Sequence, residues 1–428
     1  MKIILLIALI FQFANAKIDL YKREHKDSNT TLLIVGGIHG NEAGGYFAPS
    51  LLVSNYTILS NNLWIIPNLN QASIMAYKRG VNGDMNRKFA KKLSKKDKDK
   101  DIVDEVKKII LDKKVSLVLN LHDGHGFYRK NYQGTVFNPT AWGQTCVIDQ
   151  CKLNTKQKFG NLNKIASQVT QKVNKKLLNK HHIFDVRNTK TKFDDEAMQL
   201  SLTYFAVTNN KPAFAIETSK NLSSLSQKVF YQLLAIEEFM KIMDINFTRN
   251  FNLTEKEIDK ILKEYGKVVI NDNISLNLDD IKKHLSYIPI KSKNNLFKFT
   301  HPLGKLKKVK NSYELFIGNK KITTLKPQRF KLAEGCPDSF NIFVDKKLQV
   351  IKKASKFDVN KSFNIENIDG IRVNIIGYSS KKHKNESGVN INLNNIQRKF
   401  SVDKKEREYR IEFYKNDKFC SMSVVHFN

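Results

Sequence analysis

A histidine and a glutamate three positions apart lie in a glycine-rich segment near the start of the chain, residues 36–42, which reads GGIHGNE. On a tight turn that enters a helix, this spacing lets both side chains converge on one metal ion. Catalytic zinc sites use three protein ligands, often two histidines and one glutamate, and keep a fourth position for water. A chance surface pair is the alternative, but the glycines favour a backbone that approaches a ligand closely. We therefore predict His39 and Glu42 as two zinc ligands.

A third ligand is expected at the end of another strand. The apolar run Leu117–Leu121 is followed directly by His122, and His125 lies three residues further along, past a glycine. His122 can point over the sheet edge toward the first two ligands, whereas His125 suits a substrate-facing or structural role. We favour His122 as the third ligand and keep His125 as the alternative.

Two arginines lie between these histidines, Arg79 and Arg87, and the second belongs to residues 84–87, which read DMNR. A planar guanidinium binds a carboxylate through two parallel hydrogen bonds, which suits recognition of a peptide C-terminus. A second arginine near a metal can stabilise a developing oxyanion. In a chain this basic, the alternative is that both arginines are ordinary surface residues.

A carboxylate ends the most apolar of the later runs. Ala213–Ile216 is followed by Glu217. Burying an unpaired carboxylate is costly, so this side chain needs a partner, and a water on the metal would be a suitable one. The alternative is an acid that caps the N-terminus of the following helix.

The elements that must position these residues alternate along residues 17–245. Buried strands are expected where continuous apolar runs are bounded by Gly, Pro or polar residues. Helices are expected where apolar residues recur at helical spacing. The expected strands are Leu32–Gly36, Leu63–Pro67, Leu117–Leu121 and Ala213–Ile216, and the expected helices are Ile102–Leu111, Asn161–Leu177 and Ser226–Met243. This alternation indicates an α/β sheet with helices on both faces, whose active site gathers at the carboxyl ends of strands.

After Phe251 the pattern changes to one helical segment and then to short alternating runs separated by turn residues. These runs predict two small all-β modules, sandwich-like or barrel-like, divided near Cys336. The helix is expected at Glu255–Tyr265, and strands at Val268–Ile270, Leu315–Ile317, Ile342–Val344, Ile371–Ile376, Val389–Leu393 and Tyr409–Phe413. The predicted domains are therefore 17–248, 249–336 and 337–428, after a signal peptide at 1–16.

The signal peptide is indicated by Lys2, the apolar run Ile3–Phe11 and the small residues of Ala14–Ala16. Its apolar run is too short to span a bilayer, and no later run is long enough. A buried N-terminal strand is the alternative. We expect an exported protein that is not membrane-spanning and begins near Lys17.

The composition, with 41% hydrophobic and 27% charged residues, excludes a disordered chain. The formal net charge of +32 attracts polyanions. Export argues against nucleic acid and favours an anionic cell-wall polymer or a carboxylate-rich peptide. An equally good alternative is that the charge reflects a general abundance of lysine.

The four cysteines have no CxxC spacing, which disfavours a structural zinc knot. In an exported protein they can form disulfides. Proximity favours Cys146 with Cys151, which leaves Cys336 to pair with Cys420, although the sequence alone leaves the pairing open.

Taken together, GGxHxxE at 36–42, DxNR at 84–87, Leu-His at 121–122 and the strand-borne Glu217 resemble the zinc carboxypeptidases of the carboxypeptidase A type, including their succinylglutamate desuccinylase and aspartoacylase relatives. The resemblance covers roughly the first 245 residues and implies a mixed-sheet catalytic domain. It implies zinc ligands, a base, a carbonyl-polarising group, carboxylate-binding groups and a residue that orients a ligand. By this resemblance His39, Glu42 and His122 are the zinc ligands, and Glu217 is the base. Arg79 polarises the scissile carbonyl, Asn86 and Arg87 bind the terminal carboxylate, and Asp84 orients His39.

With its signal peptide and C-terminal β modules, the chain more closely resembles the periplasmic cell-shape DL-carboxypeptidases of helical Gram-negative bacteria. This resemblance implies a periplasmic enzyme that trims peptidoglycan stem tripeptides to dipeptides and releases meso-diaminopimelate. It also makes the C-terminal modules candidates for contact with cell-shape protein partners. No specificity pocket is evident in the sequence, so the substrate rests on the resemblance.

Two other functions stay open. A small-molecule amidohydrolase of the desuccinylase or aspartoacylase kind would use the same motifs, but export argues against it. A cell-wall-binding protein with a vestigial zinc site is disfavoured by the intact set of ligands, base and arginines.

Overall fold

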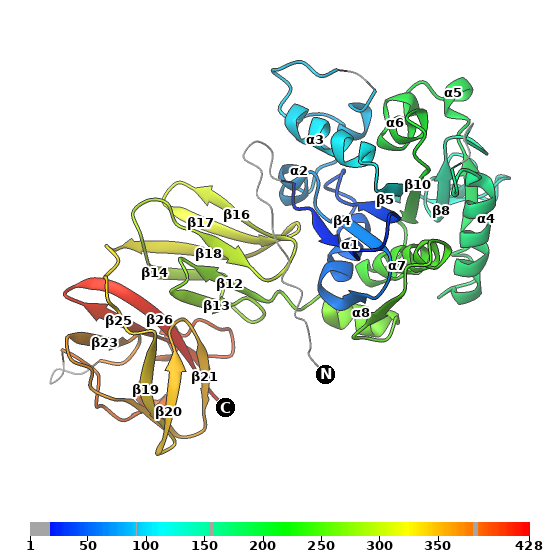
Figure 1. Cartoon of the computed structure of the whole chain (residues 1–428). Helices are drawn as coiled ribbons and strands as arrows, with labels where there is room; N and C mark the ends of the chain where they lie inside the picture. Colours follow the sequence, from blue (N-terminus) through cyan, green and yellow to red (C-terminus); the bar gives the residue numbers. More distant parts are fainter. Residues whose placement is uncertain (1–17, 91, 154–156, 380–383) are drawn as a thin grey trace. The chain divides into compact units, whose positions relative to one another are not determined.

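The computed structural model describes residues 18–428 except 91, 154–156 and 380–383. The predicted signal peptide lies outside the described residues. The chain forms two compact units, which divide after Leu262 (Figure 1). No helix in the described part of the chain is both long and apolar enough to cross a membrane.

The first unit is built on a mixed seven-stranded sheet with the order β1-β4-β2-β5-β10-β8-β9. Neighbouring strands from β4 to β10 run parallel, and antiparallel pairing joins β1 to β4 and β8 to β10. The strands are β1 (Tyr21–Arg23), β2 (Thr31–Val35), β4 (Asn62–Ile66), β5 (Val115–Gly124), β8 (Thr145–Ile148), β9 (Asp185–Asn188) and β10 (Ala213–Ser219). Every residue of β2 and β4 is buried, as expected of strands covered on both faces.

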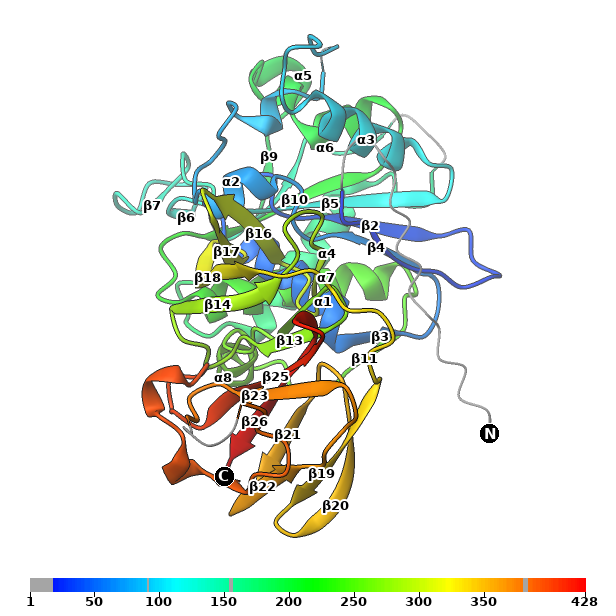
Figure 2. The same ribbon diagram turned by 90° about the vertical axis from the view of Figure 1, so that its left-hand side faces the viewer.

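Helices cover both faces of this sheet (Figure 2). On one face α1 and α4 pack against α7, and on the other α3 and α6 contact β5. The helices are α1 (Gly44–Asn55), α2 (Gln71–Met75), α3 (Lys100–Leu111), α4 (Leu162–Val173), α5 (Thr191–Asp194), α6 (Leu202–Thr208), α7 (Leu225–Ile242) and α8 (Glu255–Ile261). Side chains of Asn161, Ser201 and Ser224 cap the first turns of α4, α6 and α7.

Smaller elements complete the first unit. Two short ribbons pair β3 with β11 and β6 with β7. Their bounds, with those of the 3-10 helices, are β3 (Tyr56–Ile58), β6 (Phe127–Tyr128), β7 (Phe137–Asn138), β11 (Phe247–Arg249), η1 (Met85–Arg87), η2 (Asn174–Lys176) and η3 (Met198–Leu200). The four predicted strands and the three predicted helices of this region are confirmed.

The second unit is almost entirely β structure. One sheet has the order β15-β12-β13-β26-β25-β23, and β21 also pairs with β26. Two four-stranded sheets have the orders β14-β18-β17-β16 and β20-β19-β22-β24. The strands of the largest sheet are β12 (Lys267–Ile270), β13 (Ile274–Asn277), β15 (Phe297–Phe299), β21 (Lys356–Val359), β23 (Ile371–Ile375), β25 (Glu408–Lys415) and β26 (Lys418–Phe427).

The remaining strands of the second unit are β14 (His284–Ile290), β16 (Gly304–Val309), β17 (Ser312–Ile317), β18 (Lys320–Arg329), β19 (Ser339–Val344), β20 (Lys347–Lys352), β22 (Ser362–Ile365) and β24 (Ile391–Asn392); η4 (Leu393–Asn395) and η5 (Arg398–Phe400) follow. A buried cluster that includes Phe340, Phe363, Ile411 and Phe413 forms the core between β19, β22 and β25. The predicted fold class, an α/β domain followed by all-β structure, is confirmed.

Two contacts cross the domain boundaries that the sequence predicts. Helix α8 follows the expected boundary at 248, yet it packs against α7 and belongs to the first unit. Strand β13 precedes the expected boundary at 336, yet it pairs in parallel with β26, which lies beyond that boundary. Strand pairing between distant segments carries no local sequence signal, which is why the pattern of runs does not reveal it.

The cysteine predictions have opposite outcomes. The disulfide Cys336–Cys420 is confirmed, with a Cα–Cα distance of 5.7 Å. The pairing of Cys146 with Cys151 is wrong, since both are free cysteines. Cys146 is buried inside β8, whereas Cys151 lies exposed beyond the end of that strand, where its Sγ accepts a hydrogen bond from Asn188 at 3.2 Å. Burial raises the pKa of the Cys146 thiol.

Candidate metal centre and active site

The loop between β2 and α1 carries His39 and Glu42, and its glycines let it lie close to the next loop. Gly37 has a φ of 72°, a value that favours glycine. A Cβ on Gly40 would lie 2.0 Å from the Ser73 carbonyl, so no side chain fits there. The glycines predicted to allow a close backbone approach therefore allow one between this loop and helix α2, next to His39.

Strands β5 and β10 bring His122 and Glu217 to the same point. The two strands are parallel neighbours, and His122 lies directly opposite Glu217 in their register. Residues opposite each other in neighbouring strands project to the same face of the sheet. Both residues line the pocket over this part of the sheet.

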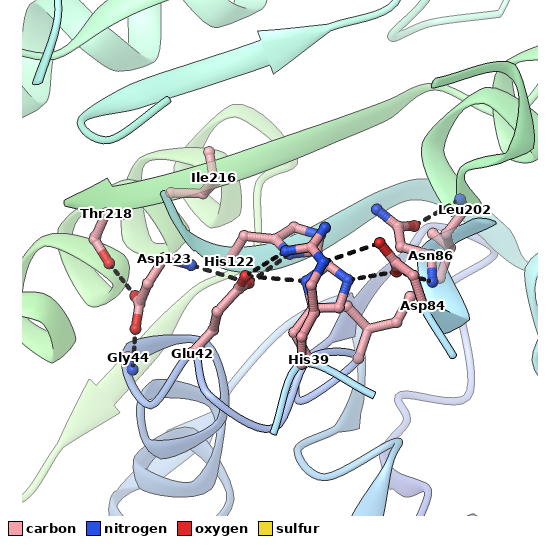
Figure 3. Close-up of polar contacts among 12 residues, drawn as sticks. His39, Glu42, Gly44, Asp84, Asn86, His122, Asp123, Leu202, Ile216 and Thr218 are labelled. Carbon is pink, nitrogen blue, oxygen red and sulfur yellow. Dashed lines mark hydrogen bonds and ion pairs between the residues drawn. The ribbon is translucent and has the colours of Figure 1, made fainter. Parts of the chain in front are cut away.

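The structure brings the three predicted ligands together (Figure 3). Nδ1 of His39 lies 3.1 Å from Glu42 Oε1, and Nδ1 of His122 lies 2.8 Å from Glu42 Oε2. One ligand atom from each of the three buried residues lies within 4.8 Å of the others, and no second such group of His, Cys, Asp or Glu occurs among the described residues. Nε2 of His39 hydrogen-bonds to Asp84 at 2.8 Å, which directs Nδ1 toward the cluster.

The donor set fits a transition-metal ion. His39 Nδ1 is buried and has no well-aligned hydrogen-bond partner. A buried nitrogen in that state is costly unless something accepts its lone pair or proton. Two imidazoles and one carboxylate match the ligand set of an open zinc site. The prediction of a metal is supported in this coarser form.

Electrostatics in the cluster are strongly coupled. Burial alone would raise the pKa of Glu42, but His39 and His122 hold it well below its usual range. Burial alone would lower the pKa of His39, but the Glu42 and Asp84 carboxylates raise it. For Asp84, hydrogen bonds from His39 and Arg79 outweigh burial and hold the pKa of its carboxyl far below the usual value. The two carboxylates are therefore ionised near neutral pH, as metal binding and ligand orientation require.

Glu217 behaves differently. Its carboxyl lines the pocket, and burial there raises its pKa to about 7; His122 opposes the shift, and the negative charges of Glu42 and Asp123 add to it. A carboxyl with a pKa near the working pH can both accept and donate a proton. This is the behaviour expected of the predicted base.

The predicted arginines and asparagine lie around the same pocket. Arg79 contacts Glu42 Oε1 at 3.2 Å and Asp84 at 2.9 Å. Asn86 is buried, and its side-chain oxygen accepts a hydrogen bond from Leu202 N at 3.0 Å. Arg87 also lines the pocket. His125 is exposed at the pocket and does not join the metal-binding cluster, so geometry favours His122 over His125.

Other pocket residues were not predicted from the sequence. Trp142, Met198 and Thr203 line the pocket from segments far apart in the chain, and no local pattern marks them. Lys220 lies 3.4 Å from Glu42 Oε1 and resembles any other lysine of a basic chain. Asp123 has one local signal in the sequence, its position directly after His122.

Asp123 ties three elements together beneath the cluster. It is buried, and it accepts hydrogen bonds from the Gly44 amide at 2.8 Å and from the Thr218 hydroxyl. Burial raises its pKa to about 6, although Lys228 and the Thr218 hydrogen bond oppose the shift. The side chain therefore joins the start of α1 to the ends of β5 and β10.

A mixed sheet that presents a His-Glu-His cluster and a carboxyl of raised pKa at its strand ends is the arrangement of a metallocarboxypeptidase, and the sequence comparison agrees. Residues 1–263 match the family described as "Carboxypeptidase controlling helical cell shape catalytic". Residues 333–428 match the "C-terminal domain of metallo-carboxypeptidase". The chain belongs to this family of cell-shape carboxypeptidases. Among curated protein sequences, none matches it.

Solved structures give the same result. The apo form of the cell shape determinant protein Csd4 from Helicobacter pylori is 33% identical, with a TM-score of 0.89, over 96% of this chain and all of that one. Tripeptide-bound Csd4 is 34% identical, with a TM-score of 0.88 over the same shares. The mDAP-bound form, described as a D,L-carboxypeptidase, is 33% identical, with a TM-score of 0.89, over 95% of this chain and all of that one.

Proposed function

We propose that this chain is a zinc-dependent D,L-carboxypeptidase that releases meso-diaminopimelate from peptidoglycan stem tripeptides and thereby affects cell shape. The observation that carries the proposal is the convergence of His39, Glu42 and His122 beside Glu217. The substrate is supported by a relative, 34% identical over nearly the whole chain, that has been solved with a bound tripeptide.

Zinc is the proposed metal, and His39, Glu42 and His122 would hold it. When bound, zinc supplies Lewis-acid polarisation of the scissile carbonyl and of a water. Asp84 holds the opposite nitrogen of the His39 ring, at 2.8 Å, so that the lone pair of Nδ1 stays directed at the cluster. The Gln232 side chain donates to the His122 carbonyl at 2.7 Å and holds that end of β5 in place.

Glu217 is the proposed general base and general acid. In its ionised form it takes a proton from the attacking water. The same carboxyl, now neutral, then passes that proton to the nitrogen of the departing residue. Burial raises its pKa to about 7 in the metal-free protein, and zinc beside it would favour the ionised form that accepts the first proton.

The polar groups on the other side of the pocket are proposed to bind and orient the peptide. Arg87 and Asn86 would hold the terminal carboxylate, because a guanidinium and an amide offer several N–H groups to it. Arg79 would lie near the scissile carbonyl and stabilise negative charge that develops on its oxygen. Its contact with Glu42 places it beside the cluster, and its exposed side chain can reach a substrate.

The proposed location is the periplasm, supported by the sequence pattern of a signal peptide at residues 1–16. The formal charge of +32 suits an enzyme that works on an anionic cell wall rather than on nucleic acid. The C-terminal β unit is the proposed contact for cell-shape protein partners.

The test is to incubate the purified protein with a muramyl tripeptide and to measure the release of diaminopimelate by mass spectrometry. We expect release that stops on chelation of the metal and returns on addition of zinc. The matched control is a tripeptide with an amidated C-terminus, which should be a poor substrate. Equal cleavage of acid and amide would overturn the carboxypeptidase assignment. Cleavage of succinylglutamate or N-acetylaspartate alone would favour a small-molecule amidohydrolase. Cell-wall binding without any cleavage would favour a vestigial site.

A further inference from the structure

Eight segments of the chain have the pattern Asn-x-Ser or Asn-x-Thr with a middle residue other than proline. In an exported protein this pattern is the acceptor for an N-linked glycan. The longer acceptor pattern that some bacteria use adds an acidic residue two positions before the asparagine. Three of the eight segments have it: residues 27–31 (DSNTT), 244–248 (DINFT) and 358–362 (DVNKS). The structure distinguishes these three segments by how accessible they are.

Segment 244–248 presents its three recognition residues to solvent. It leaves the end of α7 and continues into β11, and its burial alternates along the chain as in a strand. Ile245, which is 1% exposed, anchors the segment in the core of the first unit. Asp244, Asn246 and Thr248 are all exposed. Within the described part of the chain no hydrogen bond engages the side-chain amide of Asn246, so its nitrogen is accessible.

The backbone after Asn246 lies in a short ribbon rather than in the main sheet. β11 pairs with β3 over three residues, and this ribbon is separate from the seven-stranded sheet (Figure 2). A transferase must draw the acceptor asparagine into its own active site, which requires local opening of the backbone. A two-stranded ribbon is only marginally stable by itself, so opening here costs less than opening of the main sheet.

Segment 27–31 lies at the start of β2, which has neighbours on both sides in the main sheet. Its hydroxyl residue, Thr31, is completely buried and accepts a hydrogen bond from the side chain of Asn62 at 3.2 Å. Asn29 is exposed, yet a transferase that needs the Thr31 hydroxyl would have to pull a central strand out of the sheet. This segment therefore matches the pattern but is not accessible in the folded protein.

Segment 358–362 joins β21 to β22 in the second unit, and its asparagine is held by two neighbours. The Asn360 side chain hydrogen-bonds to the Asp345 carboxylate, and it accepts a hydrogen bond from Asn428 at 2.9 Å. Val359, beside it, belongs to the hydrophobic core of that unit. Opening of this turn would break those bonds and expose part of the core, so Asn360 is a poorer acceptor than Asn246.

We propose that Asn246 is an N-glycosylation site, which a membrane-bound oligosaccharyltransferase modifies after export. The donor is an oligosaccharide linked to a polyprenyl pyrophosphate. The amide nitrogen of Asn246 loses a proton and forms a bond to C1 of the first sugar. The bond between C1 and the pyrophosphate oxygen breaks, and polyprenyl pyrophosphate leaves with the electron pair. The inference goes beyond the proposed function and rests on the proposed periplasmic location.

A glycan on Asn246 should leave the active site open. Helix α7 begins shortly after the end of β10, where the pocket lies, and it extends over 18 residues. At about 1.5 Å per residue it is roughly 27 Å long. Asn246 therefore lies at the end of α7 that is remote from the metal-binding cluster. We expect the glycosylated and the unmodified enzyme to have the same kcat/KM for the tripeptide.

The first test combines the purified, folded chain with a bacterial oligosaccharyltransferase and an oligosaccharide linked to undecaprenyl pyrophosphate. We expect mass spectrometry of the intact protein to show the addition of one glycan, and mass spectrometry of its peptides to place that glycan on Asn246. Asn29→Gln and Asn360→Gln are the matched controls, and each should be modified like the wild type. Asn246→Gln should not be modified. Thr248→Ser, which keeps the hydroxyl, should be modified, whereas Thr248→Val should not.

A glycan that is still added to Asn246→Gln, or no addition to the folded wild type, would overturn the proposal. Short peptides with each of the three segments are the control for the transferase, and all three should be modified, since only the fold separates them.

The second test is expression of the full chain with the transferase and its donor in a bacterial host. The chain recovered from the periplasm should have the same glycan on Asn246. An exported chain that stays unmodified would overturn this inference alone. A chain that stays in the cytoplasm would overturn the proposed location, and this inference with it, while the proposed reaction would stand.

Discussion

Replacing Asp84 with asparagine should weaken zinc binding without removing any ligand. Asp84 receives hydrogen bonds from three groups: His39 Nε2 at 2.8 Å, Arg79 Nε at 2.9 Å and the Asn86 amide at 2.9 Å. Asparagine keeps the size of the side chain but offers one oxygen instead of two. It can therefore accept from His39 or from Arg79, but not from both with equal geometry.

The size of the effect follows from which group the new amide faces. If its oxygen stays with His39, the ring keeps its tautomer and loses only the negative charge beside it. If its NH₂ group turns to His39, the ring must carry its proton on Nδ1, the atom that should bind the metal. Losing the partner that orients a ligand histidine costs about 10- to 100-fold in metal affinity, or about 1.4–2.8 kcal/mol. We expect Asp84→Asn to fall in this range.

The assay is competition for zinc against a chromophoric chelator, which needs no substrate. The matched control is Asp97→Asn, because Asp97 also forms an ion pair, with Lys88 at 2.8 Å, outside the metal-binding cluster. This control should bind zinc like the wild type. If Asp84→Asn and Asp97→Asn both bind zinc with wild-type affinity, the orienting role of Asp84 is refuted.

Three further outcomes are expected. Glu217→Gln should retain zinc and bind the tripeptide, while turnover measured by diaminopimelate release falls by roughly 10²–10⁴-fold; loss of zinc would instead make Glu217 a ligand or a structural residue. Arg87→Ala should lower kcat/KM by a factor that corresponds to about 1.5–3 kcal/mol of lost binding to the substrate carboxylate, with the zinc content unchanged. A C-terminally amidated substrate should be cleaved no more slowly by the variant than by the wild type. Asp149 is buried, and burial raises its pKa from 3.8 to about 6, although hydrogen bonds from threonine hydroxyls oppose the shift. Its contribution to the stability of the fold is therefore fully present below pH 3.8 and is lost as the pH rises through 6. Urea unfolding at pH 4 and pH 7 should therefore show Asp149→Asn gaining up to about 3 kcal/mol on the wild type at the higher pH, and a constant difference would count against this account.

The sequence predicted those residues of the candidate site that directly follow an apolar run. His122 and Glu217 directly follow buried runs, so the residue order alone placed them at strand ends. The GGIHGNE and DMNR segments each combine side chains that can bind a metal or a carboxylate with residues that are typical of turns. These short-range patterns also predicted the principal strands and helices of the first unit, because a run of apolar residues records burial directly.

What escaped prediction depends on contacts between distant segments. Trp142, Met198 and Thr203 line one pocket because the segments that carry them gather around β10: β8 pairs with β10, and α6 contacts both β10 and η3. Nothing in the four residues of β8 indicates that it runs antiparallel to β10. Lys220 is one of 73 Lys and Arg residues, and only its position next to Glu42 distinguishes it. The wrong pairing of Cys146 arose in the same way, since closeness along the chain gave no information about a strand that buries one of the two thiols.

Strand β26 has a consequence for the way the protein is made. It is the last strand of the described residues, and it hydrogen-bonds to β13, β21 and β25 in the largest sheet of the second unit. It also carries Cys420, whose disulfide partner lies 84 residues earlier. A nascent chain can already form the pairs β12–β13 and β23–β25, but it cannot join them into one sheet until β26 has been synthesised. A premature stop before Lys418, which removes β26, would therefore leave one edge open on each of β13, β21 and β25, while the first unit keeps all its own strands.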